Sequence, residues 1–315
     1  MTSRVLGLGF ASLLVACSGA KTNTFSKGSS SSSDGGGGAS TSTSSGLDVS
    51  VGTLSGGGFS ASSTTSTGSG SEGCSEAAKL VYVLGKNNEL SSFSPTTKQF
   101  KPIGILNCEA QGATGHPFSM AVDRSGTAWV LFSHGSIFAV DTADASCKKS
   151  GYIPSPNLEL NLFGMGFASD DAMGTAETLY VAHFSGYGLG KIAFPSMQLS
   201  PIGPYTNGGG EGELTGTGDG RLFGFFATMP VTVSEIDKKT GAILSNAPQP
   251  TIDIGGGWAF AFWGGDLWLF TAPNGLTSQV DRYSPSTKLT TTVAQANFII
   301  VGAGVSTCAP VEQPQ

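Results

Sequence analysis

Two carboxylates stand two positions apart in "GGGEGELTG", where Glu211 and Glu213 could act as a proton donor and acceptor. Acid–base chemistry of this kind requires that the surroundings of the two groups drive their pKa values apart. The sequence favours a simpler arrangement, in which Glu213 hydrogen-bonds to backbone and Glu211 is solvated. We therefore treat both as candidate ligand-binding residues and predict no catalytic residue. The question of whether the protein is an enzyme stays open, although the sequence favours a protein without catalytic activity.

The three histidines of the chain, His116, His134 and His183, form a second candidate set. Three imidazoles can bind zinc, but nothing in the sequence fixes the distances between these three, and histidines are common in surface loops. We keep them as candidate ligand-binding residues and predict neither a metal nor another cofactor. Trp258, in the aromatic run "GGGWAFAFWGG", is the last candidate, because a sugar or peptide can stack on an exposed ring.

Other functional motifs are incomplete. The run "GYGLGKI" lacks the first Gly and the Ser or Thr of a phosphate-binding loop, and "NGGGEGELTG" leads into a strand pattern where a dinucleotide loop needs a helix. No Ser lies in the Gly-x-Ser-x-Gly motif of the hydrolase elbow. A net charge of −6 leaves no basic footprint, so we exclude nucleic acid as a partner.

The elements that must position these residues repeat along the chain. An apolar strand centred on an aromatic residue recurs at Tyr82, Trp129, Tyr180, Phe223 and Trp268, at intervals of 47, 51, 43 and 45 residues. A strand of small and apolar residues precedes four of them, and strands ending in turn residues follow each. A four-stranded antiparallel unit of this length, about 45 residues, is the size of a β-propeller blade. The 47 glycines and 12% charged residues also fit an all-β chain with many turns.

The run "AVDRSGTAWV" resembles the blades of NHL-repeat and gluconolactonase-like propellers, in which Asp-x-x-Gly turns the first strand into the second. The resemblance extends over residues 79–306 and is one of repeat type. It implies the fold much more closely than a function. Two departures are visible: the second full unit contains the insertion "DDAMGTAE", and only the first has the complete Asp-x-x-Gly-x-x-Trp.

The two ends of the repeat region complement each other. The chain offers one more small-residue strand, "FIIVGAGVS" at Phe298–Ser306, with no aromatic strand after it. The unit at Tyr82 lacks the small-residue strand before it. We therefore predict a five-bladed β-propeller over residues 74–309, closed by the C-terminal strand, with residues 310–315 as a disordered tail. Such closure removes the open sheet edges that promote aggregation.

A propeller ligand site usually lies at one mouth of the central channel, among the loops that enter first strands and those that join second and third strands. His116 precedes a first strand, and His134 and His183 end second strands, so all three are expected on that face. The first strands contain Met120–Val122, Met165–Phe167, Leu214–Gly216, Phe260–Phe262 and Val301–Ala303. These residues predict a narrow, largely apolar channel, with only Glu211 and Glu213 close to it.

The chain has five cysteines, and four of them lie in the predicted propeller region. An even number in an exported chain indicates disulfides, and four cysteines allow three connectivities. Pairing Cys74 with Cys308 would join the two ends of the ring. That leaves Cys108 with Cys147, a pair that strand alternation supports less well because it sets the two near opposite faces.

The N-terminus has the pattern of an export signal. Arg4 precedes the apolar stretch 5–16, which is too short to span a bilayer. "LVAC", ending at Cys17, resembles the bacterial lipobox, which implies that residues 1–16 are a signal peptide and that Cys17 is acylated. Ser18 next to it implies transfer to the outer membrane, with the periplasmic or outer side left open. Several acyl chains give a stable anchor where one does not.

Residues 17–73 are rich in Ser, Thr and Gly and show no periodicity, so we predict a disordered linker. A coil of this length has an end-to-end distance of about 40 Å. The sequence thus favours a membrane-anchored, monomeric binding scaffold whose propeller mouth and loops contact an envelope protein or polysaccharide. The alternatives are an envelope hydrolase or lactonase-like enzyme acting at the channel mouth, and a purely structural role.

Overall fold

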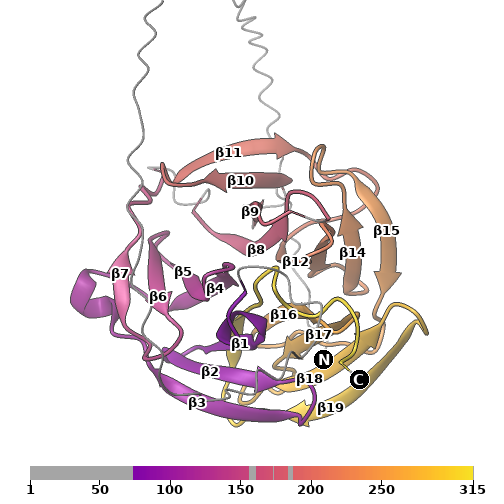
Figure 1. The fold of residues 1–315 in the computed structure, drawn as a ribbon. Coiled ribbons are helices and arrows are strands. Elements are labelled where there is room, and N and C mark those ends of the chain that lie inside the picture. Colours follow the sequence, from indigo (N-terminus) through magenta and orange to yellow (C-terminus); the bar gives the residue numbers. More distant parts are fainter. Residues whose placement is uncertain (1–73, 156–160, 173, 184–186, 315) are drawn as a thin grey trace, which may run out of the picture. The chain divides into compact units, whose positions relative to one another are not determined.

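The computed structural model describes residues 74–155, 161–172, 174–183 and 187–314. The predicted signal peptide, Cys17 and the linker lie outside the described residues. Within the described ranges, twenty strands form five four-stranded antiparallel sheets arranged as the blades of a ring (Figure 1). This confirms the prediction of an all-β, five-bladed β-propeller.

Each blade has four strands, ordered from the channel outward. Blade 1 contains β20 (Ile300–Gly304), β1 (Val81–Gly85), β2 (Glu89–Ser94) and β3 (Gln99–Ile105). Blade 2 contains β4 (Pro117–Val122), β5 (Thr127–Phe132), β6 (Ile137–Asp141) and β7 (Cys147–Lys149). Blade 3 contains β8 (Phe163–Ser169), β9 (Glu177–His183), β10 (Leu189–Ala193) and β11 (Gln198–Gly203). Blade 4 contains β12 (Gly212–Gly216), β13 (Leu222–Phe226), β14 (Thr232–Ile236) and β15 (Ile243–Pro248). Blade 5 contains β16 (Trp258–Trp263), β17 (Asp266–Thr271), β18 (Gln279–Ser284) and β19 (Leu289–Gln295). Two short 3-10 helices, η1 (Ala77–Lys79) and η2 (Cys108–Gln111), precede blades 1 and 2.

Blade 1 takes its inner strand from the far end of the chain. β20 pairs antiparallel with β1, and Tyr82 lies opposite Gly304 while Val83 lies opposite Ala303. The prediction that the C-terminal strand closes the ring is therefore confirmed. The five small-residue strands are the innermost strands, and the five aromatic residues that define the repeat lie on the strands next to them.

The core lies between neighbouring blades, because each sheet buries both of its faces. Side chains of a strand alternate between the two faces of its sheet. In β1, Val81 and Val83 pack with blade 5, whereas Tyr82 and Leu84 pack with blade 2. Five such apolar clusters, one at each junction, are formed by the described residues. This packing explains the near-continuous burial of the inner and second strands.

The inner strands β8 and β12 approach each other backbone to backbone, which requires glycine. A Cβ on Gly164 would lie 2.5 Å from the Cα of Glu213. A Cβ on Gly216 would lie 2.7 Å from the Cα of Ala168 and nearer still to the carbonyl oxygen of Phe167. Since neither neighbour is a flexible side chain, the strands would have to separate. The small residues of β8 and β12 therefore allow the two strands to lie in direct backbone contact.

We expect Gly216→Ala to lower the free energy of unfolding by about 3 kcal/mol, because the added methyl group overpacks a backbone contact. Thermal unfolding followed by circular dichroism measures the effect, and the melting temperature should fall by about 6–12 °C. Gly174→Ala is the control, since the nearest atom to its Cβ would be 3.6 Å away. Equal melting of the two variants would show that β8 and β12 have room to separate.

Both predicted disulfides are present, which confirms the pairing. Cys74 is bonded to Cys308, and Cys108 to Cys147. The second bond joins the start of η2 to the start of β7, and the backbone N–H of Cys147 donates to Asn107 Oδ1 at 2.8 Å. The crossover between blades 1 and 2 therefore brings together two cysteines that strand alternation alone placed apart.

The chain after β20 crosses the face of the ring that carries the turns between first and second strands (Figure 1). Thr307 Oγ1 donates to Glu177 of blade 3 at 2.8 Å and accepts from Arg124 of blade 2 at 3.0 Å. The Pro310 carbonyl accepts from the Gly264 N–H of blade 5 at 2.7 Å. We call this the closed face, and the opposite face, with the loops that enter first strands, the loop face.

Residues 310–314, part of the predicted disordered tail, belong to this crossing. Besides Pro310, Gln313 Nε2 donates to Asp266 Oδ2 at 3.1 Å. None of these residues lies in a helix or strand. The tail thus makes two hydrogen bonds to blade 5 that the sequence did not suggest.

Candidate functional site

Three of the predicted candidates meet at the channel mouth on the loop face. His116, Glu213 and Trp258 line one small cavity of about 160 Å³, together with Lys86 and Phe118. His116 lies in the loop that enters β4, Trp258 is the first residue of β16, and Glu213 lies near the start of β12. The role of these residues in binding a ligand stays a prediction.

Glu213 is the deepest member of this cavity, with 5% of its surface exposed. The Ser119 hydroxyl, on β4, donates to Glu213 Oε2 at 2.7 Å and accepts from the Met165 N–H at 3.0 Å. Burial raises the pKa of Glu213 well above its usual value, and hydrogen bonds from Ser119 and the Met165 backbone lower it only in part. The carboxyl thus links three neighbouring blades across the channel.

Glu211 does not share this cavity. It is half-buried, burial raises its pKa, and its backbone carbonyl accepts from the Ala227 N–H at 2.8 Å. Glu211 and Glu213 therefore do not line this cavity together.

The three histidines lie in two places. His116 and His134 belong to adjoining loops of blade 2. The backbone N–H of His116 donates to Ser133 Oγ at 3.1 Å, and the backbone N–H of Ser133 donates to the His116 carbonyl at 2.8 Å. His183, at the end of β9, lines a different cavity. Among the residues that the structure describes, no three His, Cys, Asp or Glu side chains are grouped closely enough to hold a metal ion.

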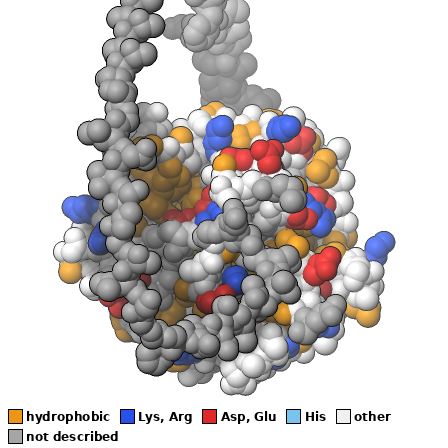
Figure 2. Space-filling view, viewed as in Figure 1, with side chains coloured by type: hydrophobic (Ala, Val, Ile, Leu, Met, Phe, Trp, Pro, Cys, Tyr) orange, Lys and Arg blue, Asp and Glu red, His pale blue; other side chains and the backbone are white. Residues whose placement is uncertain are grey.

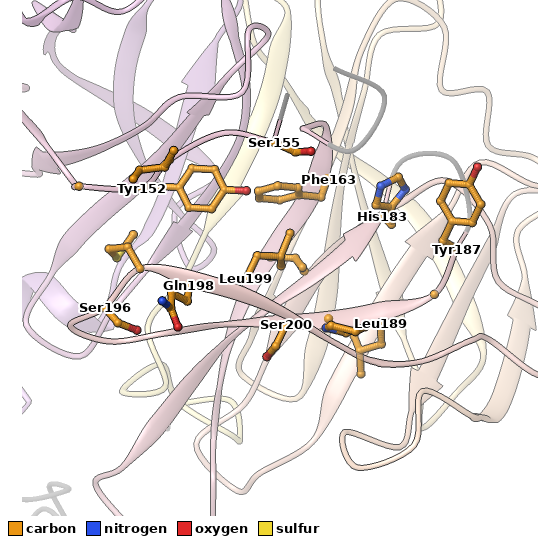
Figure 3. Close-up of a pocket in the computed structure, with 17 residues that line it drawn as sticks. Tyr152, Ser155, Phe163, His183, Tyr187, Leu189, Ser196, Gln198, Leu199 and Ser200 are labelled. Atoms are coloured by element: carbon orange, nitrogen blue, oxygen red, sulfur yellow. The ribbon is translucent and has the colours of Figure 1, made fainter. Parts of the chain in front are cut away.

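That second cavity is the larger one, about 650 Å³, and it is a groove between blades 2 and 3. Its floor is apolar and comes mainly from blade 3: Phe163, Val181, Met197 and Leu199. Tyr152, in the chain that follows β7, closes one side with its ring 6.1 Å from that of Phe163 (Figure 3). Figure 2 shows a hollow with largely apolar walls where these two blades meet.

The groove exists because the outer strand of blade 2 is short. β7 has three residues, whereas the outer strands of the other blades have six or seven. Among the described residues, blade 2 therefore leaves part of the facing sheet of blade 3 uncovered. Ile153 and Leu199, which line the groove, expose 84% and 37% of their surface, and Tyr187 at its other end exposes 66%.

The described lining of the groove carries no Asp, Glu, Lys or Arg. Burial lowers the pKa of His183 and raises the pKa of Tyr152, so both side chains are held in their uncharged forms at neutral pH. Hydroxyl and amide groups of Ser155, Ser196, Gln198 and Ser200 add polar atoms. Figure 3 shows Leu199 pointing toward Phe163, while Gln198 and Ser200 point to the other side of the strand. The groove thus has an apolar floor, and its described lining contains polar but no charged side chains.

Comparison with protein-family models gives no match, and neither does a search of curated proteins. Among solved structures, the chain is similar to one from a nidogen/laminin complex, with 8% identity and a TM-score of 0.47, covering 71% of this chain and 97% of that one. It is also similar to TolB from Acinetobacter baumannii, with 12% identity and a TM-score of 0.42, covering 71% of this chain and 65% of that one. The propeller assignment itself rests on the strand order within the five sheets.

Sequence reasoning did not find the groove, although two signals pointed to it. The interval of 51 residues between Trp129 and Tyr180 is the longest of the four, and only Lys148 and Lys149 separate Cys147 from the loop-forming "SGYIPSP". Both indicate a blade with a short outer strand followed by a long connection. The run "GYGLGKI", considered only as a phosphate loop, supplies Tyr187 to Gly190 of the groove wall.

A second buried carboxyl, Glu177, lies on the closed face. It accepts from the Arg124 backbone N–H at 2.7 Å and from Thr307 Oγ1 at 2.8 Å, and burial raises its pKa to about 6. The Arg124 guanidinium extends to Thr307 Oγ1 and to Cys74 Sγ, at 3.0 and 3.3 Å. These contacts join blades 2 and 3 to both ends of the ring, so we assign Glu177 a structural role.

Proposed function

We propose that the protein is a membrane-anchored binding module that captures an uncharged component of the bacterial envelope in the groove between blades 2 and 3. The observation that carries this proposal is the groove itself. Ligand pockets usually have volumes of about 300–1,000 Å³, apolar and aromatic walls and a few polar groups. The groove has about 650 Å³ and this kind of lining.

The channel mouth supports a function less well. Its cavity of about 160 Å³ is small for a substrate. The Glu213 carboxyl also already accepts a hydrogen bond from the Ser119 hydroxyl. An envelope hydrolase or lactonase-like enzyme remains the second candidate, because His116 and Glu213 do line the same cavity. The groove is the larger and more open of the two sites, and binding is therefore the function that we propose.

The anchor is the sequence-based part of the proposal. It is supported by the lipobox-like "LVAC" ending at Cys17 and by the Ser/Thr/Gly-rich stretch that follows. In the described part of the chain, no helix has the length and apolar character needed to cross a membrane. We propose that the acylated Cys17 holds the protein at the outer membrane, that residues 18–73 act as the tether, and that the protein is a monomer.

Leu199→Arg tests the binding function. Leu199 lies on the outer strand of blade 3 and points toward the floor of the groove, so a guanidinium there would place a charge over apolar side chains. The full-length protein, immobilised, is offered solubilised envelope proteins, polysaccharides and lipids as separate fractions. We expect at least one component to be retained by the wild type and retained at least tenfold less by the variant.

Leu244→Arg is the matched control. Leu244 occupies the corresponding second position of β15, the outer strand of blade 4, and exposes 61% of its surface without lining the groove. This variant should retain the ligand as the wild type does. If every retained component binds Leu199→Arg as well as the wild type, the groove is not the binding site and the proposal is wrong.

A further inference from the structure

We infer that the groove between blades 2 and 3 binds the acyl chain of an envelope lipid whose polar end carries no net negative charge. This inference rests on the proposed function and names the class of ligand. It would make the protein a lipid-binding propeller in which the ligand lies along β10 and β11. Three properties of the groove lead to this class: the apolar floor, the proline on its outer edge strand, and the absence of charged side chains in the described lining.

The floor favours a ligand without polar groups along its length. Phe163, Val181 and Met197 are all buried and apolar, and Leu199 points toward Phe163. A polysaccharide lying on this floor would lose the hydration of its hydroxyl groups, and a peptide that of its amides, with few partners in return. An acyl chain has no such groups to satisfy. The floor therefore selects a hydrocarbon chain over either polymer.

The outer edge of the groove also disfavours a bound peptide strand. An extended peptide can add to a sheet by hydrogen-bonding to an exposed edge strand. β11 is the outermost strand of blade 3, but Pro201 within it has no N–H to donate, and proline on an edge blocks such pairing. The edge next to the floor is thus a poor template for a further strand.

The charges of the lining limit the polar end of the ligand. The described lining has no Lys or Arg that would pair with a phosphate or a free carboxylate. An ester- or amide-linked acyl group brings no charge that would need such a partner. The strand β11 extends over about 17 Å at ~3.3 Å per residue, which accommodates an extended chain.

The test is a competition assay on the full-length protein with neutral acylglycerols. A fluorescent monoacylglycerol is bound first and then displaced by unlabelled 1-monoacylglycerols of increasing chain length, each below its micellar concentration. We expect affinity to rise about fourfold for each added methylene, which corresponds to ~0.8 kcal/mol per buried CH₂, until the chain is longer than the groove. Free fatty acids of the same length should bind more weakly, because the described lining offers their carboxylate no cation.

Two variants locate the binding. Leu199→Arg and Ile153→Arg should each weaken probe binding at least tenfold, whereas Leu244→Arg should not change it. Ile153 exposes 84% of its surface, so its replacement leaves the core intact. The Ile153 variant therefore tests the groove even if the Leu199 variant does not fold. Melting temperatures equal to that of the wild type confirm that the variants are folded.

The remaining outcomes are decisive as well. If neutral oligosaccharides or peptides displace the probe, or bind in a Leu199-dependent way while acylglycerols do not, the acyl inference is overturned and the binding function stands. If only the Cys17→Ala protein binds the probe, the acyl chains on Cys17 fill the groove, and the assignment to an envelope lipid is overturned. If binding is equal in all three arginine variants, both the inference and the proposed site fail.

Discussion

Replacing Cys74 and Cys308 together by serine is expected to lower the free energy of unfolding by about 5 kcal/mol. The bond connects residues 234 positions apart, so it restricts the unfolded chain over nearly the whole ring. In the chain-entropy account this restriction, and not any contact in the folded state, is the main source of the stability. The expected decrease in melting temperature is about 10–20 °C.

Urea denaturation of the wild type and the double variant measures the difference. Cys108→Ser with Cys147→Ser is the matched control, because that bond spans 39 positions and should contribute about 4 kcal/mol, somewhat less than the ring-closing bond. A double Cys74/Cys308 variant that unfolds at the same urea concentration as the wild type would show that the β20–β1 pairing alone holds the ends together.

Cys17→Ala is expected to abolish attachment of fatty acid completely. In the lipobox-like "LVAC" the Cys17 thiol is the group that would be acylated, and alanine offers no acceptor. The precursor should then remain uncleaved by the lipoprotein signal peptidase. Labelling with a palmitate analogue in a Gram-negative host, followed by detergent-phase partition, measures both effects.

Ser18→Ala serves as the control for Cys17→Ala, since it changes the next residue without removing the thiol. It should be labelled as the wild type is. Label retained by the Cys17→Ala protein would place the acyl group elsewhere and remove the proposed anchor.

Much of the fold could be predicted because most propeller blades are formed by residues that are close together in the sequence. The aromatic strand, the turn and the alternating apolar residues all lie within about 45 neighbouring residues. The one non-local element, β20, was predictable because "FIIVGAGVS" is a small-residue strand without a following aromatic strand. The same repeat placed His116 and Glu213 near the channel mouth, because equivalent loops gather on one face, but it did not predict that they share a cavity with Trp258.

The rest depends on contacts that no local pattern encodes. Ser119, the partner of Glu213, lies 94 positions away and on another blade. The groove depends on the length of β7 and on Tyr152 lying beside Phe163 of the next blade. The crossing of Thr307 and Pro310 over the closed face likewise follows from packing after the ring has formed.

The place of β20 in blade 1 also sets an order for folding. Blades 2 to 5 each consist of strands that follow one another in the chain, so their hairpins can form from neighbouring residues. Blade 1 must instead bring Tyr82 next to Gly304, a contact whose loop includes every other blade. Contacts with such long loops form slowly. β20 is thus the strand that closes the ring, and until it pairs, the channel-side edge of β1 has no neighbouring strand to satisfy its backbone groups.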